Sequence, residues 1–310
     1  MKKIAIFTIK EDLHSLVIQK ELRNRNISCQ LVEVDHLWEN SMFNLDFQKN
    51  NFEFLDNEQK VVDVQSLNVI WWRRSVRGQK NLPYEIPTEQ RGFINNEFEA
   101  VLFGFLHSKF KGKWISNQFS TTLASNKIYQ TEIALKNKFN VPKTIFSQNK
   151  FEISKFIKEN EFDVILKPIY GSAKVTVFTQ KIDKNNLPNE EDLDVCPAIF
   201  QEFINGNIHY RVNVFGSKIY AFKIETEDLD WRLDYTYPTS YIELEDDFKI
   251  QIFGLLKDLN LSMGILDFKV NKKDNLPYFF EINPQGNFLF LEGLTKFNLK
   301  EKFADFLLEE

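Results

Sequence analysis

Cysteine, histidine and glycine are scarce in this 310-residue chain, which contains only two, four and eleven of them. Cys29 and Cys196 lie far apart in apolar contexts, so we expect two buried free thiols in a reducing cytoplasm and no disulfide framework. Neither cysteine is accompanied by the partners of a nucleophilic catalytic set. The composition therefore gives no support to the Ser-His-Asp and Cys-His classes of enzyme.

Long apolar runs and an excess of positive charge are also missing. No apolar run reaches the roughly 18 residues that cross a bilayer. The N-terminal segment lacks the long apolar region and cleavage site of a signal peptide, so it reads as a first strand. A net charge of −5 argues against a general nucleic-acid binder. We therefore expect a cytoplasmic protein that needs neither membrane nor nucleic acid.

Apolar and aromatic residues are plentiful, at 43% and 15% of the chain, and support packed cores. The N-terminal order of strand, helix and strand favours a parallel sheet. The connection after the first strand, Lys10-Glu11-Asp12, has no glycine, so the dinucleotide-binding fingerprint is absent. The pattern predicts strands at 2–9, 28–34 and 67–72, helices at 11–25 and 88–109, and short antiparallel strands within 43–64.

Residues 264–292 read as a β-hairpin followed by a turn. Gly264–Val270 and Pro277–Ile282 are the expected strands, joined by a polar loop. If Asn271 lies opposite Pro277, then Asp267 lies directly opposite Glu281, with Cβ atoms about 5 Å apart. The hairpin is therefore expected to bring two carboxylates together.

Two facing carboxylates in an apolar hairpin repel each other, and burial would force one of them to take up a proton. A divalent cation removes this conflict, because Asp267, Glu281 and the amide oxygen of Asn283 are hard ligands that suit Mg²⁺ or Mn²⁺. Glu281, between the other two, could bridge two ions. The alternative is that both acids lie on a solvated face of the hairpin.

The segment after the hairpin, NPQGNFLFLEG at 283–293, combines strong turn residues with an apolar run. Here the sequence resembles the C-terminal hairpin of ATP-grasp carboxylate–amine ligases, and most of all those that crosslink ribosomal peptides, the microviridin or graspetide type. The resemblance extends along the whole chain. It implies an α/β (α+β) ATP-grasp fold with three lobes: an N-terminal α/β domain at 1–120, a central mobile lid at 121–204 and a C-terminal catalytic subdomain at 205–310.

The buried strand at 67–72 ends in Arg73 and Arg74. Arginines at the carboxyl end of a sheet strand are well placed to hold a carboxylate or phosphate in a crevice. The alternative is an ion pair with an acid across a domain interface. A W-x-RR segment is also found in the peptide-crosslinking ligases, and the resemblance implies that it binds substrate at the active-site cleft.

Three central segments resemble the nucleotide site of ATP-grasp enzymes. Ala124 to Lys127, with Ser125 as the expected N-cap, implies that Lys127 contacts phosphates. Lys167 ends a strand before proline, where a phosphate is its natural partner. The phosphate-covering loop begins at Gly171 and Ser172, although Ala173 and Lys174 stand where the family often has a second glycine.

The Gln201-Glu202-Phe203-Ile204 segment resembles the hinge against which adenine stacks, and the resemblance implies that Gln201, Glu202 and the backbone near Ile204 bind that base. Arg211 follows on the next strand and stands where family members carry a catalytic arginine. The family commonly has an acid before this arginine, whereas here His209 stands two residues earlier. We therefore assign no ribose contact at this point.

Two acidic segments complete the candidate site. In Asp230-Trp-Arg-Leu-Asp234, either aspartate can orient Arg232 toward a substrate oxyanion, and the alternative is a self-contained surface ion pair. The motif D-W-R recurs in the peptide-crosslinking group. The run 183–196 is expected to be a solvated loop; the resemblance implies that its Glu191 and Asp192 help to hold a basic residue of a leader peptide.

The resemblance implies an ATP-dependent ligase with two Mg²⁺ ions, or Mn²⁺ as the alternative. It would activate Asp or Glu side chains of a ribosomal precursor peptide, leader plus core, and join them to Thr or Ser hydroxyls or to Lys amines. One alternative is a ligase for small amino acids like the glutamate-adding and glutathione-synthesising relatives; another is a nucleotide-dependent peptide-binding module without turnover. A homodimer suits the family, although no segment marks an interface.

Overall fold

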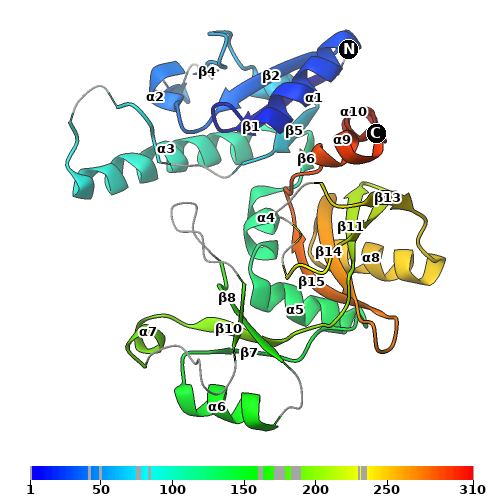
Figure 1. The fold of residues 1–310 in the computed structure, drawn as a ribbon. Helices are drawn as coiled ribbons and strands as arrows, with labels where there is room; N and C mark the ends of the chain where they lie inside the picture. Colours follow the sequence, from blue (N-terminus) through cyan, green and yellow to red (C-terminus); the bar gives the residue numbers. More distant parts are fainter. Residues whose placement is uncertain are drawn as a thin grey trace. The chain divides into compact units, whose positions relative to one another are not determined.

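The computed structural model describes residues 2–40, 43–48, 51–74, 78–82, 85–159, 163–170, 179–182, 190–229, 231 and 236–309. The chain divides into two compact units, one of residues 1–118 together with 298–310, the other of residues 119–297 (Figure 1). The expected third lobe, 205–310, differs from this division, because the C-terminal segment belongs to the first unit. The physical reason is the apolar face of its helix, described next.

The first unit is built on a four-stranded parallel sheet in the order β2-β1-β5-β6, as the β-α-β start predicted. Trp71 and Trp72 point to opposite faces: Trp71 packs on Phe303 of the C-terminal helix, and Trp72 joins the core beneath the long helix. The elements are β1 (Lys3–Thr8), α1 (Leu13–Asn24), β2 (Ser28–Glu33), α2 (Leu37–Asn40), β3 (Asn44–Asp46), β4 (Asn51–Glu53), η1 (Val64–Ser66), β5 (Val69–Trp72), α3 (Thr88–Lys109), β6 (Lys113–Ile115) and α10 (Leu299–Leu308).

The second unit contains a four-stranded antiparallel sheet in the order β7-β10-β8-β9. Ile153, Leu193 and Phe200 form a core on the face covered by two helices. The elements are β7 (Thr144–Ser147), α6 (Lys150–Glu159), β8 (Val164–Lys167), β9 (Gln180–Ile182), α7 (Glu190–Val195) and β10 (Ala198–Glu202). The strand predicted at 174–179 lies almost entirely outside the described residues.

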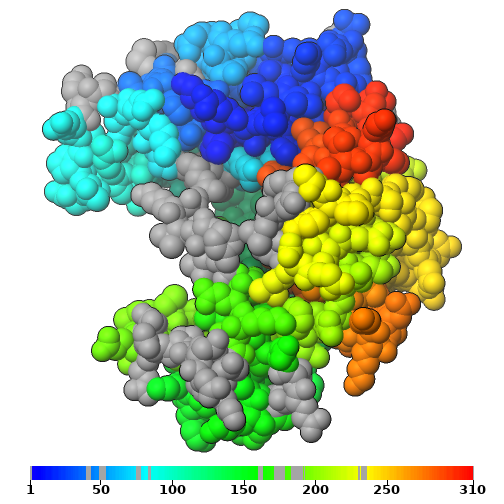
Figure 2. Space-filling model, viewed as in Figure 1, coloured from blue at the N-terminus to red at the C-terminus, as the bar shows by residue number. Residues whose placement is uncertain are grey.

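A five-stranded antiparallel sheet, β13-β12-β11-β14-β15, forms the rest of this unit. Two helices, α5 and α8, bury one face of it around Val212, Leu266 and Phe268. The opposite face carries the predicted ligands. The elements are α4 (Gln118–Ala124), α5 (Lys127–Lys136), β11 (Ile208–Phe215), β12 (Lys218–Glu225), β13 (Thr239–Ile242), α8 (Asp246–Asp258), β14 (Met263–Val270), β15 (Pro277–Asn283) and α9 (Phe290–Thr295). In the space-filling view the green and yellow parts of the unit form adjoining masses (Figure 2).

Two local predictions about the second unit need correction. Asn126, not Ser125, caps α5, because its side chain accepts from the amides of Ile128 and Tyr129, whereas the Ser125 hydroxyl donates to Thr121. Part of the acidic run expected to be a loop forms α7, since Leu193 is buried in the core beside it.

Cys29 is buried, and burial raises the pKa of its thiol to about 12, but Cys196 is exposed, contrary to the expectation of two buried thiols. Among the described helices, none is long and apolar enough to cross a membrane.

Candidate functional site

The β14–β15 hairpin places Asp267 opposite Glu281, as predicted, although the assumed pairing of Asn271 with Pro277 is wrong. Val270 pairs with Pro277 instead, and a β-bulge between the two ends of the hairpin restores the predicted carboxylate pair. Phe280 is the extra residue. Phe279 and Ile282 therefore lie in the core. Phe280 and Glu281, between them, lie on the opposite face of the sheet and contact Lys167 and Lys127 respectively.

Arg211, Asp267 and Glu281 form one row across three strands, since Arg211 pairs with Asp267 and Asp267 with Glu281. The Arg211 guanidinium donates to Asp267 Oδ2 at 2.6 Å and to the carbonyl of Asn287 at 2.8 Å. The Asp267 side chain is 12% exposed, so this ion pair is largely desolvated. A cation and two carboxylates thus meet on the face opposite the helices.

The donor set fits a divalent cation. Asn283 pairs with Ile265, two residues before Asp267 on β14, so all three predicted ligands lie close together on the hairpin. The Asn283 amide oxygen accepts from the amide of Gln285 at 3.1 Å and keeps a second lone pair. Among the described residues no cluster of three or more His, Cys, Asp or Glu could hold a metal alone. Mg²⁺ suits such a site, because it commonly takes one or two carboxylates and completes its shell with water and substrate phosphates.

The turn after the hairpin is fixed by a glycine. A Cβ added at Gly286 would come within 2.8 Å of the Ile265 side chain, so any larger residue would push the turn away from β14. The close approach also holds the Asn287 carbonyl where Arg211 donates to it. The NPQGN segment therefore positions Arg211 as well as ending the hairpin.

Two lysines from elsewhere in the unit reach this hairpin. Lys127 Nζ lies 3.3 Å from Glu281 Oε2 and 3.4 Å from the Pro168 carbonyl. Lys167 Nζ lies 5.3 Å from the centroid of the Phe280 ring and donates to Gln201 Oε1 at 2.7 Å. The structure thus places Lys127 beside Glu281 and the Pro168 carbonyl, and Lys167 beside Gln201 and Phe280.

Glu202 has a different environment from Gln201. Side chains alternate along β10, so Glu202 faces away from Lys167, and its carboxylate accepts from the amide of Lys143 at 3.1 Å. Gln201 also donates to Thr144 Oγ1 at 2.8 Å, which fixes its amide. Ile204 is buried. The geometry therefore gives Gln201 the role of orienting Lys167 and ties the Glu202 side chain to the neighbouring strand.

Arg211 also packs against the D-W-R motif. Its guanidinium carbon lies 5.4 Å from the centroid of Trp231, whose ring stacks on Phe290 of α9 with centroids 5.6 Å apart. Trp231 is the described residue of this motif. The other predicted positions, Asp230, Arg232, Asp234, Gly171 and Ser172, lie outside the described residues.

In the first unit, Arg73 and Arg74 share one carboxylate. Arg73 is 1% exposed and its Nε lies 3.3 Å from Asp12 Oδ2, while the Arg74 Nε lies 3.7 Å from Asp12 Oδ1. Burial, with Arg74 beside it, lowers the pKa of Arg73 to about 9. The Arg74 side chain is 28% exposed, so it is the member of the pair that can reach a ligand.

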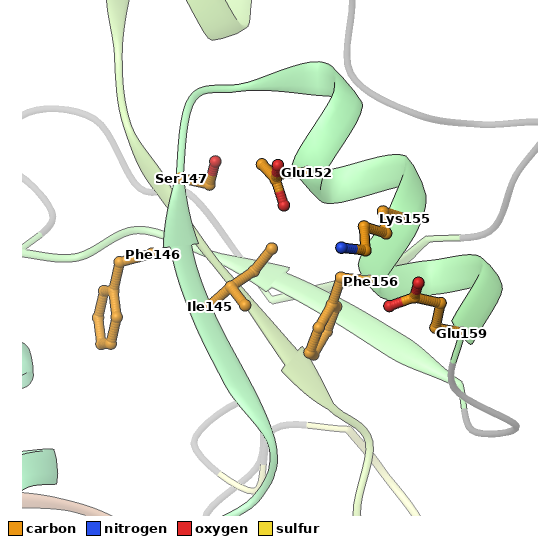
Figure 3. Close-up of a pocket in the computed structure, with 7 residues that line it drawn as sticks. All are labelled: Ile145, Phe146, Ser147, Glu152, Lys155, Phe156 and Glu159. Atoms are coloured by element: carbon orange, nitrogen blue, oxygen red, sulfur yellow. The ribbon is translucent and has the colours of Figure 1, made fainter.

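Two further features bear on the predicted sites. Glu191 is exposed on α7, and the side chain of Asp192 lies outside the described residues. A groove of about 390 Å³ lies between β7 and α6 (Figure 3), and none of the predicted site residues lines it. Its lining is Ile145, Phe146, Ser147, Glu152, Lys155, Phe156 and Glu159.

Sequence reasoning missed three residues at these sites: Asp12, Phe280 and Lys269. Asp12 follows β1 and is the N-cap of α1, a pattern that could have identified a cap but not a partner for Arg73. Phe280 faces Lys167 only because of the bulge. Lys269 lies two residues beyond Asp267 on β14, and its position in a strand whose other residues, apart from Asp267, are apolar or glycine was the available signal.

Two family models match the chain. The model of the ATP-grasp domain matches residues 124–286, and that of the MvdD pre-ATP-grasp domain matches residues 3–121. No curated protein shows significant similarity to the chain.

Solved structures match over nearly the whole length. A Chryseobacterium gregarium RiPP-associated ATP-grasp ligase, in complex with ADP and a leader and core peptide, is 26% identical with a TM-score of 0.86, and the match covers 99% of this chain and 97% of that one. The macrocyclase MdnC from Microcystis aeruginosa, bound with its precursor peptide MdnA, is 23% identical with a TM-score of 0.88, and the match covers 99% and 100%.

These likenesses confirm the predicted α/β fold. The ATP-grasp domain model spans just over half of the residues, including Lys127, Lys167, Arg211 and the hairpin carboxylates. The resemblance inferred from the hairpin and its turn is thereby confirmed, and the chain belongs to the ATP-grasp family.

Proposed function

We propose that this protein is an ATP-dependent, ADP-forming ligase that closes rings in a ribosomal precursor peptide. It activates Asp or Glu side chains of the peptide and joins them to Thr or Ser hydroxyls, forming esters, or to Lys amines, forming amides. The observation that carries this proposal is the row Arg211, Asp267 and Glu281 with Lys127 beside it, on a fold similar to ligases solved with leader and core peptides.

The reaction proceeds in two steps. The peptide carboxylate attacks the γ-phosphorus of ATP, a P–O bond to ADP breaks, and an acyl phosphate forms. A hydroxyl or amine of the same peptide then attacks the acyl carbon, loses its proton and expels inorganic phosphate. Both transition states need charge stabilisation and positioning rather than a protein nucleophile.

Each cationic side chain has a place in this scheme. Lys127 and Lys167 reach toward the phosphates from the hairpin side, with the Gly171–Ser172 loop covering them. Arg211 and Arg232 stabilise negative charge on the reacting carboxyl and phosphoryl groups. Two Mg²⁺ ions, or Mn²⁺ as the alternative, would be held by Asp267, Glu281 and Asn283, and would neutralise the triphosphate.

Other residues bind the peptide and the adenine base. Arg74, oriented by Asp12 and Arg73, binds a carboxylate of the peptide, and Asp230 and Asp234 orient Arg232. Glu191 and Asp192 on α7 hold a basic residue of the leader. Glu202 and the backbone near Ile204 bind the edge of the adenine base. To do this, the Glu202 carboxylate gives up its hydrogen bond with the Lys143 amide. The enzyme is cytoplasmic and works as a homodimer.

The test uses a short peptide encoded beside this gene whose C-terminal half repeats Thr, Ser or Lys with Asp or Glu. Incubation with the protein, ATP and Mg²⁺ should lower its mass by one water per ring and release one ADP per water. Glu281→Ala should abolish both signals. An unchanged peptide mass, with ADP released when a free amino acid is added, would indicate a ligase for small molecules instead. Nucleotide binding without ADP release, even with the peptide present, would support a binding module.

A further inference from the structure

Gln130, on α5, is a buried residue whose carboxamide is bonded through its oxygen and through its nitrogen. Its Nε2 atom donates to the Ala124 carbonyl at 2.6 Å and to the Ile282 carbonyl at 2.8 Å, and its Oε1 atom accepts from the Ile282 amide at 3.0 Å. Gln130 is 3% exposed, so water does not compete for these groups. Because two carbonyls need donors and one amide needs an acceptor, only one orientation of the carboxamide fits. None of the roles assigned above uses this residue.

The bonds to Ile282 hold the outer edge of the hairpin. β15 is the outermost described strand of the five-stranded sheet. Ile282 pairs with Leu266 on β14, and its own N–H and C=O point away from that strand toward Gln130, which supplies the donor and the acceptor of a further strand. Earlier along β15, the Phe279 amide donates to the Asn140 carbonyl at 2.8 Å. The edge is therefore bonded on both sides of the bulge.

Ile282 stands between two of the predicted metal ligands. Its N–H belongs to the peptide plane shared with Glu281, and its C=O belongs to the plane shared with Asn283. A carboxamide bonded to both groups restricts the rotation of both planes, and so the direction in which each ligand leaves the backbone. The third ligand, Asp267, lies on β14 with a strand paired on either side. The two ligands on the edge strand depend on Gln130 for the support that a second neighbouring strand gives Asp267.

The third bond of Gln130 reaches the start of its own helix. Ala124 is the last residue of α4, and α5 begins three residues later with Lys127. The Lys127 ammonium is the group that lies 3.3 Å from Glu281 Oε2. One side chain therefore joins the turn that carries this cation to the strand that carries its carboxylate.

We propose that Gln130 is a positioning residue of the divalent-cation site, holding Glu281 and Asn283 in the arrangement that binds Mg²⁺. The inference rests on the metal site of the proposed function. Gln130 touches neither the cation nor the nucleotide in this role and acts through the backbone of Ile282. Groups that orient metal ligands from behind typically contribute about 10–100-fold to metal affinity. Without the carboxamide, two buried backbone groups of β15 lose their partners and the ligands lose their fixed direction.

The experiment measures how much Mg²⁺ strengthens nucleotide binding. Calorimetry compares the binding of AMPPNP, an ATP analogue that resists hydrolysis, in excess Mg²⁺ and in EDTA. Gln130→Met keeps the length of the side chain but removes the carboxamide. This variant should lose about tenfold of the strengthening by Mg²⁺ and should keep the affinity of the unmodified protein in EDTA. A role in folding alone would lower the melting temperature and leave the ratio of the two affinities unchanged.

A second variant and a control complete the design. Gln130→Ala favours the helix and leaves room for water to bond to Ile282, so it should fold even if the methionine variant does not. It should lose the effect of Mg²⁺ to a similar extent, because a water molecule does not fix the strand. The matched control is Gln19→Met: Gln19 is 7% exposed and donates to the Cys29 carbonyl at 3.1 Å in the first unit. This control should lower the melting temperature without changing the ratio.

The outcomes separate this inference from the proposed function. An unchanged effect of Mg²⁺ in the folded Gln130 variants would overturn the inference and leave the metal site intact. Failure of both variants to fold would also overturn it, because the hydrogen bonds would then serve folding. Equal binding of AMPPNP by the unmodified protein in Mg²⁺ and in EDTA would contradict the metal site itself and this inference with it. A Mg²⁺ effect that depends on Gln130, in a protein that leaves the peptide unmodified, would contradict only the peptide part of the proposed function.

Discussion

The two units each contain a buried arginine paired with an aspartate, and the two pairs have different surroundings. Asp12 accepts from the Thr8 hydroxyl, the Ser15 amide and the Ser15 hydroxyl besides Arg73, all within the first turn of α1 and the strands beside it. Asp267 pairs with Arg211 in a row that continues to Glu281 and Lys127. Asp12 has two arginines and otherwise neutral donors around it, whereas Asp267 belongs to a row that adds a second acid and a lysine.

The difference shows how a buried ion pair can be assigned a role. Removing charges from water costs free energy in both places. At Asp12 that cost is offset by a helix cap and two hydroxyls, so the pair stabilises the end of β1 and the start of α1. At Asp267 the neighbours add charge instead of neutral donors, and such convergence of acids and bases is typical of sites that bind a charged ligand.

The largest expected effect, which sharpens the comparison of the two ion pairs, is a loss of folding stability when Asp12 is replaced. Asp12→Asn leaves Arg73 buried without its counter-charge and should lower the free energy of unfolding by about 3–5 kcal/mol. Urea-induced unfolding of the variant and of the parent protein measures this loss of stability. Adding Arg73→Met to the variant should recover most of the loss. A single variant within about 1 kcal/mol of the parent would mean that Asp12 is not the main support of Arg73.

The next effect is on catalysis. Glu281→Gln removes one carboxylate of the pair and should slow peptide modification at least a hundredfold, about 2.7 kcal/mol in the barrier, with little change in melting temperature. Rates of ADP release and product mass measure it. The matched control is Glu152→Gln, an exposed glutamate in the groove beside α6, which should keep the full rate. Equal rates for the two variants would remove Glu281 from the site.

The smallest effect concerns the stability of the protein at low pH. Burial alone raises the pKa of Asp12, but Arg73, Ser15 and Arg74 together outweigh it and hold the pKa below its usual range. A carboxyl whose pKa is lowered in the folded state contributes stability above its unfolded pKa of about 3.9, and this contribution is lost as the pH falls through the folded value. The urea midpoint of the parent should therefore fall more steeply below about pH 4 than that of Asp12→Asn/Arg73→Met. Parallel curves would contradict the assignment.

The hairpin shows how far the sequence could lead. Alternating polarity and the turn residues were enough to predict the two strands and the facing carboxylates. They could not reveal the bulge, because its cause is the packing of Phe279 and Ile282 into one core, and period-two counting assumes regular pairing. The carboxylate pair was predicted correctly through a register that the structure does not have.

Other features depended on distant contacts and were missed for that reason. Asp12 looks like an ordinary cap in the sequence, and its partner Arg73 is 61 residues away. The neighbours of Lys269 are also distant in the sequence: its ammonium lies near the Phe203 ring, which follows β10, and it pairs with His209 on β11. The acidic run at 190–194 is polar enough for a loop, and a single buried leucine makes it a helix.

The bulge at Phe280 has a consequence for recognising relatives by motif. It absorbs one residue between the loop and Glu281, so the number of residues from aspartate to glutamate is not fixed by strand geometry. A relative whose hairpin loop is one residue longer or shorter could keep the same carboxylate pair by losing or moving the bulge. Searches that require one fixed spacing would pass over such a chain, whereas the pairing of the two carboxylates would still identify it.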